Sequence, residues 1–207
     1  MAKITTLNAF DDDKPKKILL TNEELEKILK TNFHLRMVDT EGLRNSYPLT
    51  QEQYAEAEAY AIKLGMLKNK IRRSDHINTI YVDDWDLLVI GTDVFPLPKR
   101  TDNPNSNISV YGAIAHEIVG HREAFMSGNA ILTKEDKLNK MSGTIDLKIY
   151  VYKNLLDEVQ ASIRAAKFTP DLIDLERKDL WDDAIIRLKK NRINFEEIKN
   201  KLAINVR

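Results

Sequence analysis

The chain has 207 residues, with 32 Lys or Arg, 32 Asp or Glu, and no cysteine. A zero net charge gives no support for a nucleic-acid partner, because domains that bind nucleic acids are typically basic. The absence of cysteine excludes disulfides and thiolate metal sites, so any metal ion would be held by histidine and carboxylate side chains. A short basic run at 68–73 (KNKIRR) is interpreted as a solvated face.

The N-terminal residues MAKITTLNAFDDDKPKK lack the apolar stretch of a secretory signal peptide. No apolar run in the sequence reaches the length of a membrane span, so we expect a soluble protein without a membrane partner. We expect a polar lead-in over residues 1–20 and a single domain over residues 21–207, helical from about residue 170 onward.

Helix-start signals mark the first part of the chain. The residues TNEE at 21–24 match a capping box and predict a short helix to about residue 30. Thr50 with Gln53 predicts a second, longer helix. Residues 77–96 are rich in β-branched and bulky side chains, broken by Asp-Asp and by Gly, which is typical of a strand pair or hairpin. Pro, Asn and Ser then indicate a loop over 97–109.

The second half reads as helical. We expect helices over about 110–126 and 146–167, a polar connection with one helical turn over 128–143, and a last helical region to about 202 with a break near 191–194. Thr169 and Pro170 are interpreted as the N-cap and first residue of that last region. The predicted class is therefore α+β, rich in helix, with one small sheet that we expect to be antiparallel.

The segment AHEIVGHRE at 115–123 carries the strongest chemical signal. Zinc peptidases commonly use His-Glu-x-x-His, in which two ligands four residues apart share one helical face. Here His116 and His121 are five residues apart, and on a regular helix their side chains would diverge by about 140°. A π-type turn would bring them into line, and Gly120 lies where that distortion is needed. The spacing therefore predicts a metal site on a widened turn.

A third ligand should be a carboxylate or a histidine on another element. In the downstream stretch LLDEVQASIRAA at 155–166, Glu158 lies on the predicted long helix. Small residues on that helix would let it pack closely against the histidine helix; they are Ala161, Ala165 and Ala166. The predicted ligand set is His116, His121 and Glu158, which suits zinc. We interpret His34 and His76 as structural or surface residues.

HEIVGH and DEVQAS together resemble the dipeptidyl peptidase III family of zinc peptidases, whose motifs are HExxGH and EExxAD or EExxAE. The first motif is complete, and the second matches at Glu158 and Ala161. The resemblance implies a zincin-like domain with an HExxxH active-site helix, in which Zn²⁺ is bound by His116, His121 and Glu158. It also implies that Glu117 activates the attacking water as general base.

The second motif departs from the family at two positions. Asp157 replaces its first Glu, and Ser162 replaces its final acid. Zinc-bound imidazoles usually donate their second N–H to a carboxylate or a carbonyl, so Ser162 leaves one histidine without the expected acid. Asp157 is our candidate for that role. The resemblance covers only these two segments of a much larger family.

A broader pattern over about 88–190 runs VIGTDVFP, an Asn/Ser loop, AHEIVGHREA, DEVQASIRAA and FTPDL. This layout resembles the C-terminal toxin domains of bacterial polymorphic secreted proteins of the Rhs and filamentous-haemagglutinin type. It implies an effector domain that is delivered into a target cell and neutralised by an immunity protein.

These observations predict a zinc-dependent hydrolase acting on a peptide or protein. We expect the extended substrate to pair with a strand within 88–95. The alternatives are a metal-dependent hydrolase of a nucleotide or nucleic acid, and a non-catalytic binding module.

Other polar and aromatic residues admit two interpretations. Asp93 could support a metal ligand or serve a turn, and Tyr111 could donate to an oxyanion or simply pack. Trp85 and Trp181 are expected to be core anchors, and Arg164 is expected at the surface.

Overall fold

The computed structural model describes residues 42–76 and 78–205. The expected lead-in over 1–20, the helix expected near 21–30, and His34 all lie outside the described residues. Within the described residues the fold is α+β and rich in helix, as predicted, with one small sheet.

The helices follow their capping signals. Thr50 caps the first of them through the predicted box: its side chain accepts from Gln53 N–H, and its own N–H donates to the Gln53 side chain. The α-helices are α2 (Gln51–Lys63), α3 (Pro104–Asn107), α4 (Val110–Ala115), α5 (Glu123–Met126), α6 (Lys134–Met141), α7 (Leu147–Phe168), α8 (Asp174–Lys190) and α9 (Phe195–Ile198). A π-helix, η4 (His116–Arg122), joins α4 to α5. Short 3-10 turns are η1 (Lys68–Lys70), η2 (Asp83–Trp85), η3 (Thr92–Val94) and η5 (Lys199–Lys201).

The long helix and the break between α8 and α9 agree with the sequence-based prediction. The start of the last helical region does not, since Thr169 is the residue that ends α7 and α8 begins only at Asp174. Threonine before proline favours an extended backbone, which suits the end of one helix as well as the start of another.

The sheet has three strands in the order β1-β3-β2, namely β1 (Ile71–Arg73), β2 (Ile80–Val82) and β3 (Leu87–Ile90). β2 and β3 form the expected antiparallel hairpin, with Tyr81 opposite Leu88. β1 pairs with β3 in parallel, so the sheet is mixed and the expectation of an antiparallel sheet was wrong for this pair. The basic run at 68–73 hid β1, because three residues with a single buried apolar side chain carry no period-two pattern.

The position of β3 corrects a second expectation. β3 lies at the centre of the sheet, with β1 on one side and β2 on the other. A substrate therefore cannot add to it as a neighbouring strand, because both of its edges already carry strands. β2 is the edge strand on the side where the η4 helix packs.

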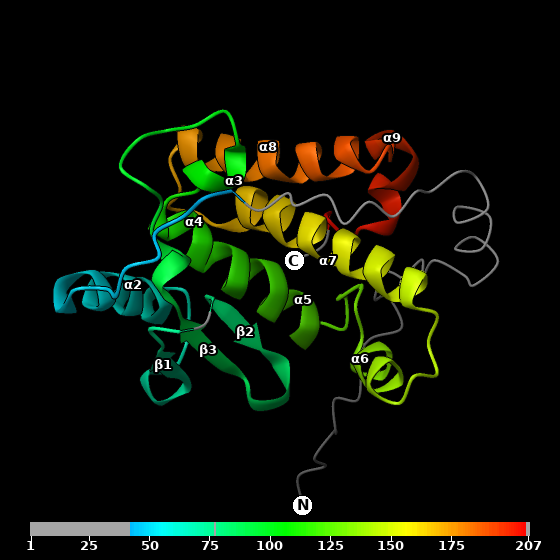
Figure 1. Cartoon of the computed structure of the whole chain (residues 1–207), viewed down its shortest axis with the longest axis horizontal. Helices are drawn as coiled ribbons and strands as arrows, with labels where there is room; N and C mark the ends of the chain where they lie inside the picture. Colours follow the sequence, from blue (N-terminus) through cyan, green and yellow to red (C-terminus); the bar gives the residue numbers. More distant parts are fainter. Residues whose placement is uncertain (1–41, 77, 206–207) are drawn as a thin grey trace, which may run out of the picture.

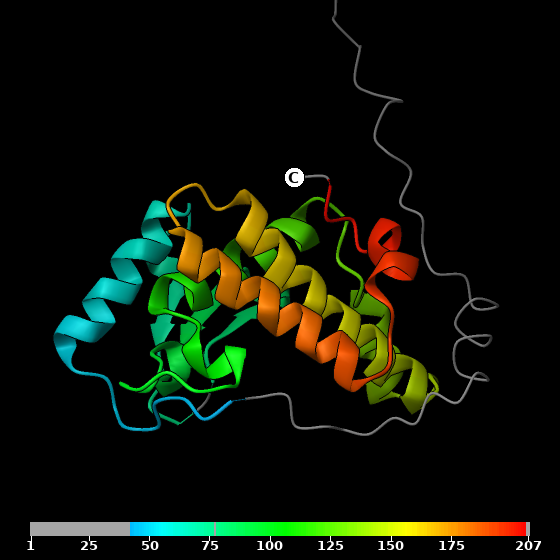
Figure 2. The same cartoon turned by 90° about the horizontal axis from the view of Figure 1, so that it is seen from above.

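The elements stack in layers around the π-helix. Figure 1 shows α4, η4 and α5 as one continuous rod between the sheet and α7, with α8 on the far side of α7. α7 packs against both η4 and α8, and Figure 2 shows α7 and α8 running side by side from above. The rod and α7 are thus pressed together at the middle of the fold.

Three apolar clusters hold these layers. One lies between α2, the sheet and the rod, and includes Ala57, Leu88 and Ile114. A second joins α7 and α8 to the C-terminal turns, and a third, of alanine, leucine and isoleucine side chains, fills the contact of α4 with α7 and α8. The expected anchors are absent from all three, since Trp85 is 68% exposed and Trp181 is 37% exposed.

The prediction for Arg164 was also wrong. Its side chain is fully buried on α7, not exposed. Its guanidinium donates to the Ala203 carbonyl and lies against the Phe168 ring. A buried guanidinium needs such partners, and the accepting carbonyl comes from the C-terminal turn, which no local pattern indicates.

Gly120 is the point of closest approach between η4 and α7. A Cβ added there would lie 2.7 Å from the Ala161 carbonyl oxygen and 2.8 Å from its Cα. Any side chain at position 120 would therefore push the two backbones apart. The small residues expected to permit close packing do so at Ala161.

We expect Gly120→Ala to lower the free energy of unfolding by about 1–3 kcal/mol, the usual cost of overpacking. Gly112→Ala is the comparison variant and should cost less, because the three nearest atoms to its Cβ would all belong to side chains, the closest being Ile108 Cγ2 at 2.9 Å, and none to the backbone. Urea unfolding of the metal-free proteins, followed by circular dichroism, measures both. Equal losses in the two variants would contradict the contact.

Candidate metal centre

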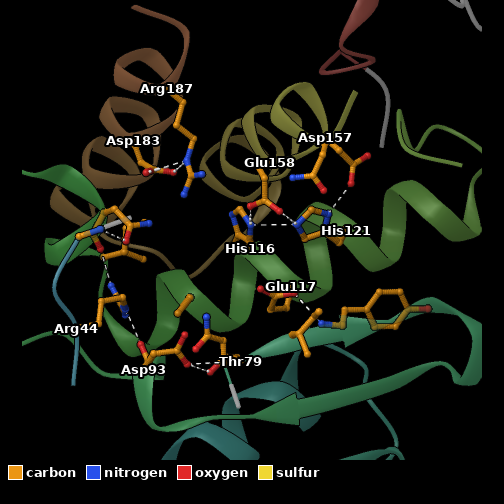
Figure 3. Close-up of a pocket in the computed structure, with 18 of the residues that line it drawn as sticks. Arg44, Thr79, Asp93, His116, Glu117, His121, Asp157, Glu158, Asp183 and Arg187 are labelled. Carbon is orange, nitrogen blue, oxygen red and sulfur yellow. Dashed lines mark hydrogen bonds and ion pairs between the residues drawn. The ribbon is translucent and has the colours of Figure 1, made fainter. Parts of the chain in front are cut away.

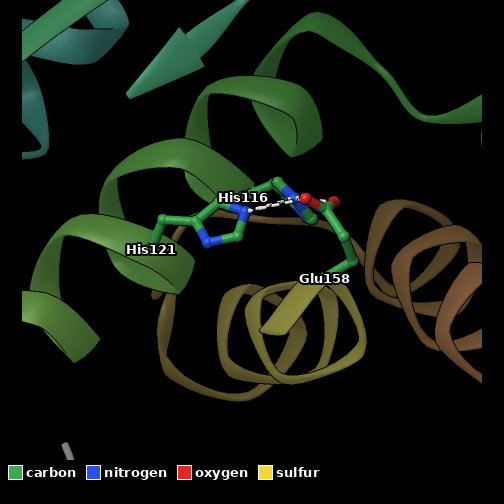
Figure 4. A group of neighbouring side chains, drawn as sticks. All are labelled: His116, His121 and Glu158. Carbon is green, nitrogen blue, oxygen red and sulfur yellow. Dashed lines mark hydrogen bonds and ion pairs between the residues drawn. The ribbon is translucent and has the colours of Figure 1, made fainter. Parts of the chain in front are cut away.

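The π-helical turn places the two histidines of the motif side by side. At its end the Glu123 N–H donates to the Ile118 carbonyl, five residues back, as in a π-helix. The His116 and His121 rings meet edge to face with centroids 4.8 Å apart, and their Nε2 atoms are 3.1 Å apart. The widened turn predicted from the spacing is therefore confirmed, and Figure 4 shows both rings directed to the same point.

Glu158 reaches that point from α7. Its Oε2 lies 3.3 Å from His116 Nε2, and its Oε1 lies 3.7 Å from His121 Nε2. The candidate ligand atoms of the three residues all lie within 4.8 Å of one another, and Figure 4 shows the carboxylate facing both rings. The structure thus brings together the three residues predicted as ligands, although His121 and Glu158 lie 37 positions apart in the sequence.

The chemistry of this cluster favours a cation. Two imidazole nitrogens and a carboxylate oxygen crowd one point, and such lone pairs are costly to enclose unless a proton or a metal ion lies between them. Two nitrogens and one oxygen form a set that zinc accepts, with a fourth position left for water or substrate. These three residues can therefore hold a metal ion.

Asp157 orients His121. Its Oδ2 lies 3.1 Å from His121 Nδ1, the ring nitrogen that faces away from the other ligands. Its Oδ1 accepts hydrogen bonds from the backbone N–H groups of Ile131 and Leu132, at 2.9 and 3.0 Å. The carboxylate is fixed from both sides, so it can hold the imidazole in one orientation. We expected Asp157 to replace the acid missing at position 162; it does support a histidine, but that histidine is His121, whereas Ser162 lies beside His116.

Ser162 occupies the corresponding place beside His116. Its Oγ lies 3.0 Å from His116 Nδ1 and 2.9 Å from Asp183 Oδ2 on α8. Asp183 in turn accepts from Arg187 Nε at 3.1 and 3.0 Å, and Figure 3 shows this group above His116. The sequence analysis missed Asp183, because only the packing of α8 on α7 brings it to the site.

Glu117 lies on the sheet side of the same turn, as Figure 3 shows. Its Oε2 accepts a hydrogen bond of 2.8 Å from the Tyr81 backbone N–H on β2. Burial raises the pKa of Glu117 above its ordinary value, and the nearby His121 and His116 offset the shift only in part. The raised pKa makes this carboxylate a better proton acceptor than an ordinary glutamate.

The pKa values of His121 and Glu158 depend on the charges around each of them. Burial alone would lower the pKa of His121, but the hydrogen bond to Asp157 and the charges of Glu158, Asp157 and Glu117 raise it to about 10. Burial alone would raise the pKa of Glu158, yet the contact with His116 and the charges of His121, His116 and Arg187 hold it well below its usual range. Without metal, the site therefore keeps a proton on His121 and a charged Glu158.

A cavity of about 1000 Å³ opens beside these side chains. Residues 78–81 line it from the sheet, and residues of α6, α7 and α8 line it from the helical side. Arg44 fixes one end by donating to the carbonyls of Asp93, Val94 and Asn105. At the other end Lys137 of α6 pairs with Asp83 in the hairpin turn, 2.7 Å away. The candidate metal cluster of His116, His121 and Glu158 thus lies in an open cleft with both polar and apolar lining.

Three further residues singled out in the sequence lie apart from the candidate metal ligands. His76 is exposed. Tyr111 packs against Tyr60 and donates to Glu56, so its hydroxyl is directed away from the cluster. Asp93 accepts from the backbone and the hydroxyl of Thr79, at 2.7 and 2.8 Å, which is the turn role among its two interpretations.

Comparisons with protein-family models, with curated proteins and with solved structures find no match to this chain. The two resemblances drawn from the sequence therefore rest on the quoted motifs alone. Among the described residues, no helix combines the length and the apolar character needed to cross a membrane.

Metal binding at pH 7.5 is expected to release about one proton per ion. His121 has a pKa of about 10 in the metal-free protein, and a ligand nitrogen must give up its proton to bind a metal. Titration calorimetry with Zn²⁺ in buffers of different ionisation enthalpy measures the proton count. Asp157→Asn should lower the count, because it removes the acceptor that raises the pKa, whereas a count near zero in the unmodified protein would contradict the assignment.

The same shift links the stability of the metal-free protein to pH. Because the folded pKa of His121 lies above its ordinary value of 6.5, its contribution to stability is complete below pH 6.5 and is lost as the pH rises toward 10. Thermal unfolding across this range, compared between the unmodified protein and Asp157→Asn, should show a steeper decline in the unmodified protein.

Proposed function

We propose that this chain is a zinc-dependent hydrolase that cleaves peptide bonds. The observation that carries the proposal is the convergence of His116, His121 and Glu158 on one point, with the buried carboxylate of Glu117 on the same widened turn. Three protein ligands and an open fourth position are typical of catalytic zinc, whereas structural zinc sites are closed by four ligands.

The geometry suggests separate roles for a bound zinc ion and for Glu117. A zinc ion bound by the three ligands would lower the pKa of a water molecule and polarise a substrate carbonyl. Glu117 would accept the proton of that water and deliver it to the leaving nitrogen, because its raised pKa suits both transfers. The Tyr81 N–H holds the carboxylate against β2, which keeps it oriented while the proton moves.

We place the substrate beside β2 rather than β3, because β2 is the edge strand. The Tyr81 N–H is taken by Glu117 and the Thr79 N–H by Asp93, so a peptide beside them would have to pair through carbonyl groups. Residues 78–81 line the cavity, so an extended peptide can lie beside them with its carbonyl near the metal ligands. Main-chain pairing of this kind binds peptides without demanding particular side chains.

The cationic side chains of the cavity weigh against phosphate-bearing substrates. Among its described lining residues, Arg44 is bound to backbone carbonyls, Lys137 to Asp83 and Arg187 to Asp183. Each of these positive charges is already engaged by groups of the protein. Sites for nucleotides and nucleic acids instead leave positive charges available to bind phosphate. A peptide, whose main chain is uncharged, suits the cavity better.

The test combines metal content with hydrolysis. Mass spectrometry of the purified protein should give about one zinc ion per chain, and Glu158→Ala should lose it. Glu117→Gln should keep the zinc but cut casein about 10²–10⁴-fold more slowly, since only the proton acceptor is removed. Glu123→Gln, at the end of the same turn, is the matched control and should keep both zinc and activity.

Three outcomes would overturn the proposal. Absence of zinc after its addition would leave the cluster as a buried polar group without a metal. Cleavage of RNA or DNA in place of casein, lost in Glu117→Gln, would assign a different substrate. Full activity in Glu117→Gln would remove the general base.

A further inference from the structure

The metal cluster is connected to α8 by a continuous chain of hydrogen bonds. From His116 the chain passes through the Ser162 hydroxyl to Asp183 and then to Arg187. We propose that Asp183 is a positioning residue of the metal centre, which acts on His116 through Ser162. The inference rests on the proposed zinc site and adds to it a residue outside both sequence motifs.

The series of hydrogen bonds is buried, so the charge of Asp183 must be compensated within the protein. The side chain of Asp183 is 0% exposed and that of Arg187 is 9% exposed, and Ser162 is also fully buried. A buried carboxylate is costly unless its charge is compensated and its oxygens accept hydrogen bonds. Arg187 provides the compensation, and Ser162 provides a hydrogen bond from the side of the metal cluster.

The direction of each hydrogen bond follows from the groups present. A carboxylate only accepts, so the single hydroxyl proton of Ser162 is donated to Asp183. The Ser162 oxygen is then left as an acceptor toward His116 Nδ1, which must carry the proton of the ring. In the neutral ring that would bind a metal ion, His116 Nε2 is then the unprotonated nitrogen, and it faces Glu158 as a candidate ligand atom.

The two histidines therefore receive equivalent support by different routes. His121 contacts the carboxylate of Asp157 directly. His116 reaches a carboxylate only through one hydroxyl, and that carboxylate comes from α8 rather than α7. The acid missing at position 162 is thus supplied by another helix, which makes the metal centre depend on the packing of α8 against α7.

The experiment measures zinc affinity by competition with a chromophoric chelator, together with the absorption spectrum of the Co²⁺-substituted protein. Asp183→Asn and Ser162→Ala should each weaken zinc binding by about 10–100-fold, as the loss of such partners typically does. The double variant should bind zinc about as well as Ser162→Ala alone, because the carboxylate acts through the hydroxyl. Adding Ser162→Asp to Asp183→Asn should restore affinity and the Co²⁺ spectrum.

Asp179→Asn is the matched control. Asp179 is a second buried carboxylate on α8, and it pairs with Arg100, away from the metal cluster. Its replacement should lower the melting temperature of the metal-free protein but leave zinc affinity unchanged. If Asp183→Asn does not fold, Ser162→Ala decides the question, since it breaks the chain while Asp183 keeps Arg187.

Zinc affinity within about threefold of the unmodified protein in both Asp183→Asn and Ser162→Ala would overturn the inference, as would an equal loss in Asp179→Asn. The result also separates this inference from the proposed function. A protein that binds zinc and shows the expected variant effects, yet cleaves no peptide, would sustain the inference alone. A protein that binds no zinc would overturn both.

Discussion

The contact between Gly120 on the π-helical turn and Ala161 on α7 is the constraint on which the rest of the site depends. It allows two helix backbones to approach until an added Cβ would lie within 2.8 Å of the Ala161 backbone. Glu158 lies one helical turn before Ala161, so the same approach carries its carboxylate to both histidines. The glycine thus serves the widened turn and the helix contact together, and the sequence motif HExxGH is a packing motif as much as a chemical one.

The second feature is the density of charge around this contact, carried by the buried Glu117 and by half-buried side chains beside it. Three carboxylates and two imidazoles gather on two adjacent helices, and each has a defined partner: Glu117 the Tyr81 N–H, Asp157 His121, and Glu158 both rings. Such groups are stable in a low-dielectric interior only when their charges are balanced. The fold balances them locally with His121, whose pKa is raised to about 10, and from outside with Arg187. A bound cation would complete that balance.

The small sheet matters to the site mainly because it positions Glu117. Its strands are short, but the edge strand β2 lies against the π-helix and orients Glu117 through one backbone N–H. The hairpin turn beyond β2 is tied to α6 by Asp83 with Lys137 and by Asp84 with Lys134. The cavity is therefore bounded by elements from distant parts of the sequence, and its polar lining is committed largely to holding those elements together.

Local sequence determined the α+β class, the capping of α2, the long helix α7 and the need for a π-turn between His116 and His121. Each depends on spacing or on neighbouring residues, and such information survives without a fold. The choice of Glu158 could also be predicted, because the small residues after it indicate a close helix contact. Only the tertiary structure decided that β1 completes a mixed sheet, and that the tryptophans are exposed while Arg164 is buried. It also decided that Asp183 is linked to His116 through Ser162. These depend on which surfaces meet across long separations in sequence, and no periodic pattern within one segment records that choice.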